Sequence, residues 1–221
     1  MVNSLGNRNL TVVNVDSFYG LPVMVDKGPF VLEYLERLRG VINSALADYP
    51  RVLAFRADLR IPNRLGLADD FNTNKVISRF FESFKAKIES DRHRARVAAT
   101  YAHDTKVRYF WVREMSTGNV QHYHVLILLN MDAYYTVGRL GSDRVNMVRR
   151  LDEAWASALG LELHDVSGLV EFPANATWRL RSNADDFTRT LSSLFHRASY
   201  LCKSATKHYG QQHHGMGGSR K

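Results

Sequence analysis

The sequence predicts an α+β fold, in which a single domain has a mainly antiparallel central sheet flanked by helices. Three observations support this prediction. The chain has 221 residues, of which 45% are hydrophobic and 24% charged, as is typical of a globular protein with a sizeable core. Strand-like runs and amphipathic helical stretches alternate irregularly along the chain. Two neighbouring strand-like runs flank the sequence STGN at 116–119, which predicts an antiparallel hairpin.

Apolar residues at helical spacing predict the helices. Pro29 suits the first turn of the first helix, and Asp186 has a favourable place in the first turn of the last. The third helix is expected to be capped by Ser142 and to stop at Gly160. The predicted helices span about 29–47, 72–89, 142–160 and 183–207.

Runs rich in β-branched and aromatic residues predict the strands, the first of which is closed by Pro62. These strands span 51–61, 107–115, 120–129 and 168–172. The prediction divides the chain into three parts: an N-terminal segment (1–50) with one helix that packs on the core, a core (51–207), and a Gly/His-rich basic tail (208–221) that is expected to be mobile.

Composition excludes several classes of protein. The single Cys cannot form a disulfide within the chain, which excludes a disulfide-stapled miniprotein. No run approaches the roughly 20 apolar residues that a membrane span needs. One unpaired thiol and the lack of an export signal at the N-terminus predict a cytoplasmic protein.

The positive charge is unevenly distributed. The chain carries 30 Lys and Arg against 22 Asp and Glu, a net charge of +8. Residues 187–221 contain no acidic residue and six basic ones. This block indicates an acidic partner, of which nucleic acid is the commonest, although a solvated basic surface explains the charge equally well.

Two histidines open the second strand of the hairpin. Because side chains alternate across a strand, His122 and His124 project from the same face, about 7 Å apart at their roots, while Tyr123 faces the other way. Two imidazoles in this arrangement form a bidentate metal clamp. The alternative is a pair of separate histidines that pack or hydrogen-bond locally.

Glu114, on the preceding strand, extends this pair if the hairpin has one particular register. A hairpin loop with an odd number of residues places Glu114 opposite His122 and Val112 opposite His124, so that paired residue numbers sum to 236. A slip of one residue would bring Arg113 opposite His122 instead. Two imidazoles and one carboxylate suit Mg²⁺ or Mn²⁺ acting on phosphate oxygens, and also suit zinc. The alternative for Glu114 is a solvated carboxylate.

A second group of polar residues lies on one face of the predicted last helix. Tyr200 is an aromatic residue on this face, and neighbouring lysines would favour its phenolate and hold a phosphate. The alternative is an amphipathic tyrosine at the edge of the core, and Tyr209 is a competing nucleophile. Lys207, Arg197 and His196 are expected to contact DNA. The polar face contains Ser193, His196, Tyr200, Lys203, Ser204 and Lys207.

These motifs resemble those of a known superfamily. HYHVLILLN (122–130) resembles the His-hydrophobic-His signature of HUH endonucleases, and YLCK (200–203) resembles their Tyr-x-x-Lys nucleophile motif. Successive blocks of the chain also resemble the inovirus-type, or YagK/YfjJ C-terminal, replication-protein family. The blocks are RADLRIP (56–62), FWVREMSTGNVQHYHVLILLN (110–130), AWASALG (154–160), GLVEFP (168–173) and SYLCKSATK (199–207).

The resemblance implies metal-dependent nicking and joining of single-stranded DNA at the replication origin of a phage, prophage or plasmid in a bacterial host cell. It implies that His122 and His124 bind Mg²⁺ or Mn²⁺, with Glu114 in the place of an acidic third ligand. It also implies that Tyr200 is the nucleophile and that Lys203 orients the strand. Because the chain lacks a G-x-x-x-x-G-K-[ST] loop, unwinding and synthesis are expected from a host helicase and polymerase.

Three alternatives remain open at this point. One is a related HUH activity, that of a transposase or a relaxase. Another is a non-catalytic module in which aromatic residues of the hairpin stack on the bases of a single strand, rather than packing in the core. The third is a structural zinc site in the tail, formed by His208, His213 and His214. The aromatic residues in question are Tyr109, Phe110, Trp111 and Tyr123.

Overall fold

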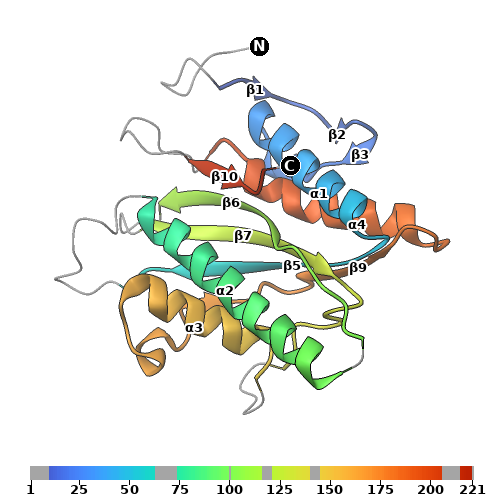
Figure 1. Cartoon of the computed structure of the whole chain (residues 1–221). Helices are drawn as coiled ribbons and strands as arrows, with labels where there is room; N and C mark the ends of the chain where they lie inside the picture. The colour runs from blue at the N-terminus through green and yellow to red at the C-terminus, as the bar shows by residue number, and fades with distance from the viewer. Residues whose placement is uncertain are drawn as a thin grey trace.

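An antiparallel sheet of six strands runs through the centre of the described chain in this computed structural model (Figure 1). The structure describes residues 10–62, 74–99, 101–115, 121–139, 145–205 and 215–220. The sheet has the order β10 (Met216–Gly218), β6 (Arg108–Met115), β7 (Gln121–Asn130), β5 (Arg51–Arg60) and β8 (Val170–Glu171), and β9 (Thr177–Arg181) also pairs with β5.

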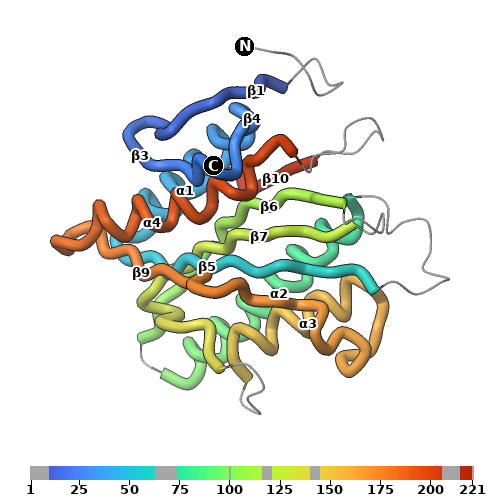
Figure 2. Tube along the Cα trace, turned by 180° about the vertical axis from the view of Figure 1, so that it is seen from behind, coloured from blue at the N-terminus to red at the C-terminus, as the bar shows by residue number. Residues whose placement is uncertain are grey.

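Helices cover both faces of this sheet (Figures 1 and 2). On one face α2 (Lys75–Ala98) and α3 (Met147–Leu159) enclose a core that includes Trp111 and Tyr123. On the other face α1 (Leu32–Asp48) and α4 (Phe187–Ser199) enclose a second core, which includes Phe110 and Leu126. Successive residues of β6 and β7 thus alternate between the two cores, as the pleat of a strand requires. The architecture confirms the predicted α+β class with its antiparallel sheet and flanking helices.

The N-terminal segment packs on the α1/α4 side of the sheet (Figure 2). The predicted first helix is wrong at its start, because residues 30–31 are extended and pair with residues near the beginning of the chain. The short elements of the N-terminal segment that precede α1 are β1 (Val12–Val13), β2 (Ser17–Phe18), β3 (Leu21–Pro22), the 3-10 turn η1 (Val25–Lys27) and β4 (Phe30–Val31). None of the helices in the described part of the chain has the length and apolar composition that crossing a bilayer requires.

The second and third predicted helices are present with different ends. α2 continues well past the last apolar residue of its buried face, Ile88, because polar contacts support its second half. Asp91 in that half accepts a hydrogen bond from Tyr134 at 2.6 Å and forms an ion pair with Arg150 of α3. The N-cap of α3 is Asn146, and the predicted cap Ser142 lies outside the described residues. The 3-10 turn η3 (Leu163–Val166) follows α3.

Gly160 ends α3 as predicted. Its φ of 67° lies in the left-handed region, where a glycine meets no steric penalty. Val145, which lies inside the predicted range 142–160, precedes the observed helix and is 64% exposed.

The predicted helix over 183–207 is wrong at both ends. α4 begins after Asp186 and ends at Ser199. The 3-10 turn η4 (Tyr200–Cys202) follows, and Lys203 then pairs with Phe30 in an isolated bridge. Position 207 lies outside the described residues. The tighter turn places Tyr200 at the end of the helix rather than on its exposed side, and it turns Lys203 back over the sheet.

Two strands of the central sheet, β9 and β10, were missed in the sequence. β9 alternates buried and exposed residues, but it is short and basic. β10 lies in the segment that was expected to be a mobile tail, and it pairs with β6 at the edge of the sheet. A Cβ atom on Gly217 would lie 2.7 Å from the ring of Trp111, so only a glycine fits beneath this indole. The missing side chain of Gly217, which weakens the usual strand pattern, is what lets this strand pack.

Candidate active site

The hairpin between β6 and β7 has the predicted register. Glu114 pairs with His122, and Val112 pairs with His124. Arg113 pairs with Tyr123, whose side chain belongs to the core on the α2/α3 face. The carboxylate and both imidazoles therefore share the other face, and the arginine is turned away from them. The hairpin loop itself, at 116–120, lies outside the described residues.

Three potential ligand atoms converge on this face. The Glu114 Oε2 atom lies 3.4 Å from His124 Nε2 and 4.0 Å from His122 Nε2. The centroids of the two imidazole rings are 4.9 Å apart, and one ligand atom from each residue lies within 4.8 Å of the others. Two imidazole nitrogens and one carboxylate oxygen form a donor set that can hold a divalent cation. We refer to Glu114, His122 and His124 as the metal cluster.

The metal cluster is buried on one side and partly open on the other. Glu114 and His124 are buried, whereas the side chain of His122 is 24% exposed. Burial lowers the pKa of His122, and the neighbouring His124 adds to this effect. Burial also acts against the charged form of His124, but hydrogen bonds to Asp58 and Glu114 outweigh it and raise the pKa of this imidazole. Because His122 is the most exposed of the three side chains, its side of the cluster is the more accessible one.

Asp58 is a site residue that the sequence analysis did not identify. It lies on β5 directly opposite His124, and its Oδ1 atom is 2.5 Å from His124 Nδ1. A carboxylate on one ring nitrogen fixes the orientation of the imidazole and directs the other nitrogen toward a metal. Nε2 of His124 indeed faces Glu114. The sequence feature that could have identified Asp58 is the alternation of polar residues at positions 56, 58 and 60 in an otherwise apolar strand.

The candidate nucleophile lies beside the metal cluster. Lys203 Nζ donates a hydrogen bond to the Tyr200 hydroxyl at 2.6 Å, and the same ammonium lies 3.3 Å from Glu114 Oε2. The Tyr200 ring centroid is 6.0 Å from that of His124. The structure therefore brings Tyr200, Lys203 and the metal cluster together. The turn η4 achieves this, and not the extended helical face that the sequence predicted.

The metal cluster fits a divalent cation in its chemistry as well as in its geometry. Glu114 is only 3% exposed, so its carboxylate needs a positive partner. Lys203 supplies one at 3.3 Å in this structure. A bound cation would share the carboxylate with this ammonium, and both histidines have a nitrogen on the same side.

The residues that were expected to contact DNA lie in different environments, and one of them lies outside the described residues. The side chain of Arg197 donates to the Ala174 carbonyl at 2.9 Å, and its own carbonyl accepts a hydrogen bond from Arg56. His196 lies in the last turn of α4 and is partly buried. Lys207 lies outside the described residues, as does the competing tyrosine at 209. His208, His213 and His214, the ligands of the alternative zinc site, also lie outside them.

Three of the four hairpin aromatics belong to the core, and the fourth, Tyr109, is partly buried and packs against it. Phe110 and Tyr123 are completely buried, and Trp111 is 9% exposed. The Tyr109 ring stacks on Phe81 of α2, with centroids 3.7 Å apart. Because helices cover both faces of the sheet, these rings do not form an open platform on which bases could stack.

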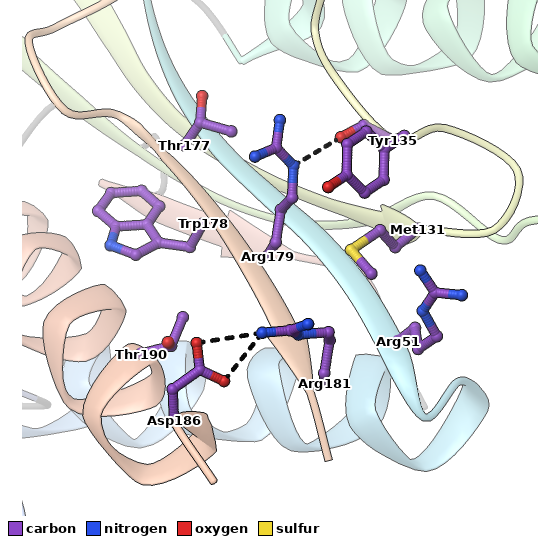
Figure 3. A pocket seen from close by; sticks show the side chains of 9 residues that line it. All are labelled: Arg51, Met131, Tyr135, Thr177, Trp178, Arg179, Arg181, Asp186 and Thr190. Atoms are coloured by element: carbon purple, nitrogen blue, oxygen red, sulfur yellow. Dashed lines mark hydrogen bonds and ion pairs between the residues drawn. The ribbon is translucent and has the colours of Figure 1, made fainter. Parts of the chain in front are cut away.

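A separate surface pocket of about 370 Å³ lies at the other end of β5, where the strand begins (Figure 3). Its arginines are already engaged: Arg181 pairs with Asp186 at 3.2 Å, and Arg179 donates to the Tyr135 carbonyl at 3.0 Å. Arg51 pairs with Asp132, at 2.6 Å. Internal partners thus offset most of the positive charge here. The pocket is lined by Arg51, Met131, Tyr135, Thr177, Trp178, Arg179, Arg181, Asp186 and Thr190.

Comparison with known proteins identifies the family. The model of the YagK/YfjJ C-terminal domain matches residues 13–219. The chain belongs to this family. It is 34% identical over 198 residues to the uncharacterized protein YagK of Escherichia coli strain K12, a match that covers 87% of this chain and 95% of the relative. It is 32% identical over 200 residues to the uncharacterized protein YfjJ of the same strain, with 87% and 96% covered. No solved structure matches the chain.

The family match includes most of the N-terminal segment as well as β10. Both parts pack on the sheet that carries the metal cluster. The site is therefore contained within the family domain, and the cluster residues, Asp58, Tyr200 and Lys203 all lie inside the matched range.

Proposed function

We propose that this protein nicks and joins single-stranded DNA through a covalent 5′-phosphotyrosine intermediate, and that it initiates rolling-circle replication of a phage, prophage or plasmid. The proposal includes membership of the HUH endonuclease superfamily, which the His-hydrophobic-His and Tyr-x-x-Lys motifs suggest. One observation carries it: the Lys203 ammonium contacts both the Tyr200 hydroxyl and the carboxylate of the metal cluster. A tyrosine, a lysine and a metal cluster at this range are the components of phosphoryl transfer to a tyrosine.

The side chains of the site have complementary roles in this reaction. His122, His124 and Glu114 would hold Mg²⁺ or Mn²⁺, which when bound neutralises charge on the scissile phosphate. Lys203 holds the Tyr200 hydroxyl toward the cluster, and its positive charge stabilises the phenolate that develops during attack. Asp58 keeps the His124 ring in its orientation.

The products explain the link to replication. The Tyr200 oxygen bonds to phosphorus while the bond from phosphorus to the 3′-oxygen breaks. The phenolic proton passes to solvent, and the released 3′-oxygen takes up a proton from solvent to become a hydroxyl. The released 3′-hydroxyl can prime a polymerase, and the phosphotyrosyl bond remains available for a later 3′-hydroxyl to rejoin the strand. The partners required by the proposal are single-stranded origin DNA and the host helicase and polymerase, in the cytoplasm of a bacterial cell.

Two other functions are distinguished from this one by different observations. A relaxase or single-strand transposase would use the same residues, and the DNA substrate would distinguish these activities. A non-catalytic stacking module would need exposed aromatics on the sheet, whereas Phe110 and Tyr123 are completely buried.

The test is a covalent-adduct assay. The protein is incubated with single-stranded DNA from a phage origin and Mn²⁺, and a denaturing gel then shows whether a protein–DNA adduct has formed. We expect an adduct with the wild-type chain, none after EDTA treatment and none with Tyr200→Phe. DNA binding that survives EDTA without any cleavage, on origin sequences of all three source classes, would instead favour the binding module.

A further inference from the structure

Arg56 is a buried cation at the centre of the sheet. The residue is 5% exposed and lies in the middle of β5. Because alternate residues of a strand share a face, its side chain projects toward the site on the same side as Asp58. A guanidinium stays charged at every physiological pH, so burying it is costly unless it is fully paired.

The contacts of Arg56 do not repay this cost. Its Nη1 atom donates to the Arg197 carbonyl at 3.3 Å, its Nη2 atom lies 3.6 Å from Asp58 Oδ1, and its buried Nε atom has no hydrogen-bond partner among the described residues. Unsatisfied buried donors are rare in native proteins. Replacing a buried ion pair with apolar residues is often neutral or stabilising. Stability alone therefore does not explain an arginine at this position.

The same side chain contacts both halves of the site. On one side it pairs with Asp58, whose carboxylate holds His124 of the metal cluster at 2.5 Å. On the other side it binds a carbonyl in the last turn of α4, directly before η4. Its guanidinium carbon also lies 5.5 Å from the centroid of the Tyr200 ring. Few side chains have the length and the forked donors to reach three such partners.

We propose that Arg56 is a positioning residue that couples the metal cluster to the candidate nucleophile. Its fork holds Asp58 against His124 and the end of α4 against the sheet, while its charge lies beside the Tyr200 ring. This inference rests on the proposed function in assigning Tyr200 as the nucleophile. The link through Asp58 to the metal cluster is independent of that assignment.

The test compares Arg56→Met, which keeps the length and removes the charge, with Arg56→Lys, which keeps the charge and removes the fork. At saturating DNA and Mn²⁺ we expect Arg56→Met to slow adduct formation about tenfold or more, with the KM for DNA changed by less than about twofold, because positioning affects the reacting geometry and not the binding of the strand. Without DNA, we expect its affinity for Mn²⁺ in calorimetry to fall about tenfold, the lower end for outer-shell residues. Arg56→Lys should recover part of the adduct rate.

A matched control removes an arginine elsewhere. Arg181 pairs with Asp186 in the pocket of Figure 3, and its side chain is 52% exposed. Arg181→Met should leave the adduct rate and the Mn²⁺ affinity at wild-type values. Thermal unfolding of all three variants separates positioning from folding, since the rates are compared only at temperatures at which each variant is fully folded.

The outcomes distinguish this inference from the proposed function. Wild-type adduct rates and Mn²⁺ affinity in Arg56→Met would overturn it, as would losses that match a fall in folded protein. If Arg56→Met does not fold, Arg56→Lys decides: slower adduct formation at an unchanged melting temperature supports the inference, and a wild-type rate overturns it.

If the wild-type chain forms no adduct, the proposed function fails, and the affinity for Mn²⁺ decides whether Arg56 acts on the metal cluster through Asp58. Weaker binding by Arg56→Met than by Arg181→Met then supports that link, and equal binding overturns it.

Discussion

The Lys203 ammonium donates a hydrogen bond to the Tyr200 hydroxyl at 2.6 Å. The same ammonium lies 3.3 Å from the buried carboxylate of Glu114, so one cation joins the candidate nucleophile to the metal cluster. This arrangement depends on the end of α4 at Ser199, because a continuous helix would not turn Lys203 back over the sheet. This contact explains how Tyr200 and Lys203, which follow α4, become part of a site whose metal cluster lies on the paired strands β6 and β7.

Tyr200→Phe should abolish the covalent adduct and leave DNA binding nearly unchanged, because only the hydroxyl is removed. The measurements are the denaturing-gel assay and a filter-binding or anisotropy titration with the same oligonucleotide. Tyr209→Phe is the control, and it should form the adduct normally. An adduct that disappears with Tyr209→Phe and persists with Tyr200→Phe would reverse the assignment.

Lys203→Ala should slow cleavage at saturating DNA by about 100-fold, since the Tyr200 hydroxyl loses the donor that positions it. The number of Mn²⁺ ions bound per chain should not change, because Lys203 is not a ligand. Single-turnover kinetics and calorimetry measure the two quantities. An unchanged rate would remove the proposed role of this lysine.

Asp58→Asn should weaken Mn²⁺ binding by about 10- to 100-fold, because an amide holds the His124 ring less firmly than a carboxylate does. Glu114→Gln should weaken it as well, and a higher Mn²⁺ concentration should restore nicking in both variants. Calorimetry and the nicking assay over a range of Mn²⁺ concentrations test this. Wild-type Mn²⁺ affinity in Glu114→Gln would exclude the glutamate as third ligand.

Replacing Asp152 on α3 should stabilise the fold by an amount that depends on pH. Burial raises the pKa of this carboxyl from 3.8 to about 6, with Arg149 opposing the shift. The contribution of Asp152 to stability is therefore fully present below about pH 3.8 and is lost as the pH rises through about 6. Asp152→Asn should raise the melting temperature more at neutral pH than at pH 4, by a modest amount because solvent still reaches the group. Asp185→Asn, at an exposed position, should show no such difference.

Two glycine substitutions should have opposite effects on stability. Gly217→Ala introduces a Cβ atom 2.7 Å from the Trp111 ring, and this overpacking should destabilise the fold by about 1–3 kcal/mol. Gly40→Ala, inside α1, has open space for its Cβ atom and should stabilise the fold by about 0.5–1 kcal/mol. Denaturant unfolding measures both. A Gly217→Ala variant as stable as the wild type would mean that β10 does not pack beneath Trp111.

The sequence by itself determined the elements of the site that depend on local pattern. The spacing between Glu114 and His122 left two registers open, and the expectation of a metal site selected the observed one, because only this register places a carboxylate rather than an arginine beside the imidazoles. The alternation of side chains predicted that His122 and His124 share a face. Short-range periodicity likewise located the helices α1 to α4 and the three longest strands, β5, β6 and β7, since an apolar face repeats within each element.

Only the tertiary structure decided which distant residues complete the site. Asp58 meets His124 because β5 pairs with β7, and these partners are separated by 66 positions in the chain. The end of α4 is set by a contact between Lys203 and Phe30, and β10 is held by pairing with β6 and by the space beneath Trp111. Local propensity carries no information about such pairings, because their free energy arises only when segments far apart in the sequence are already in place.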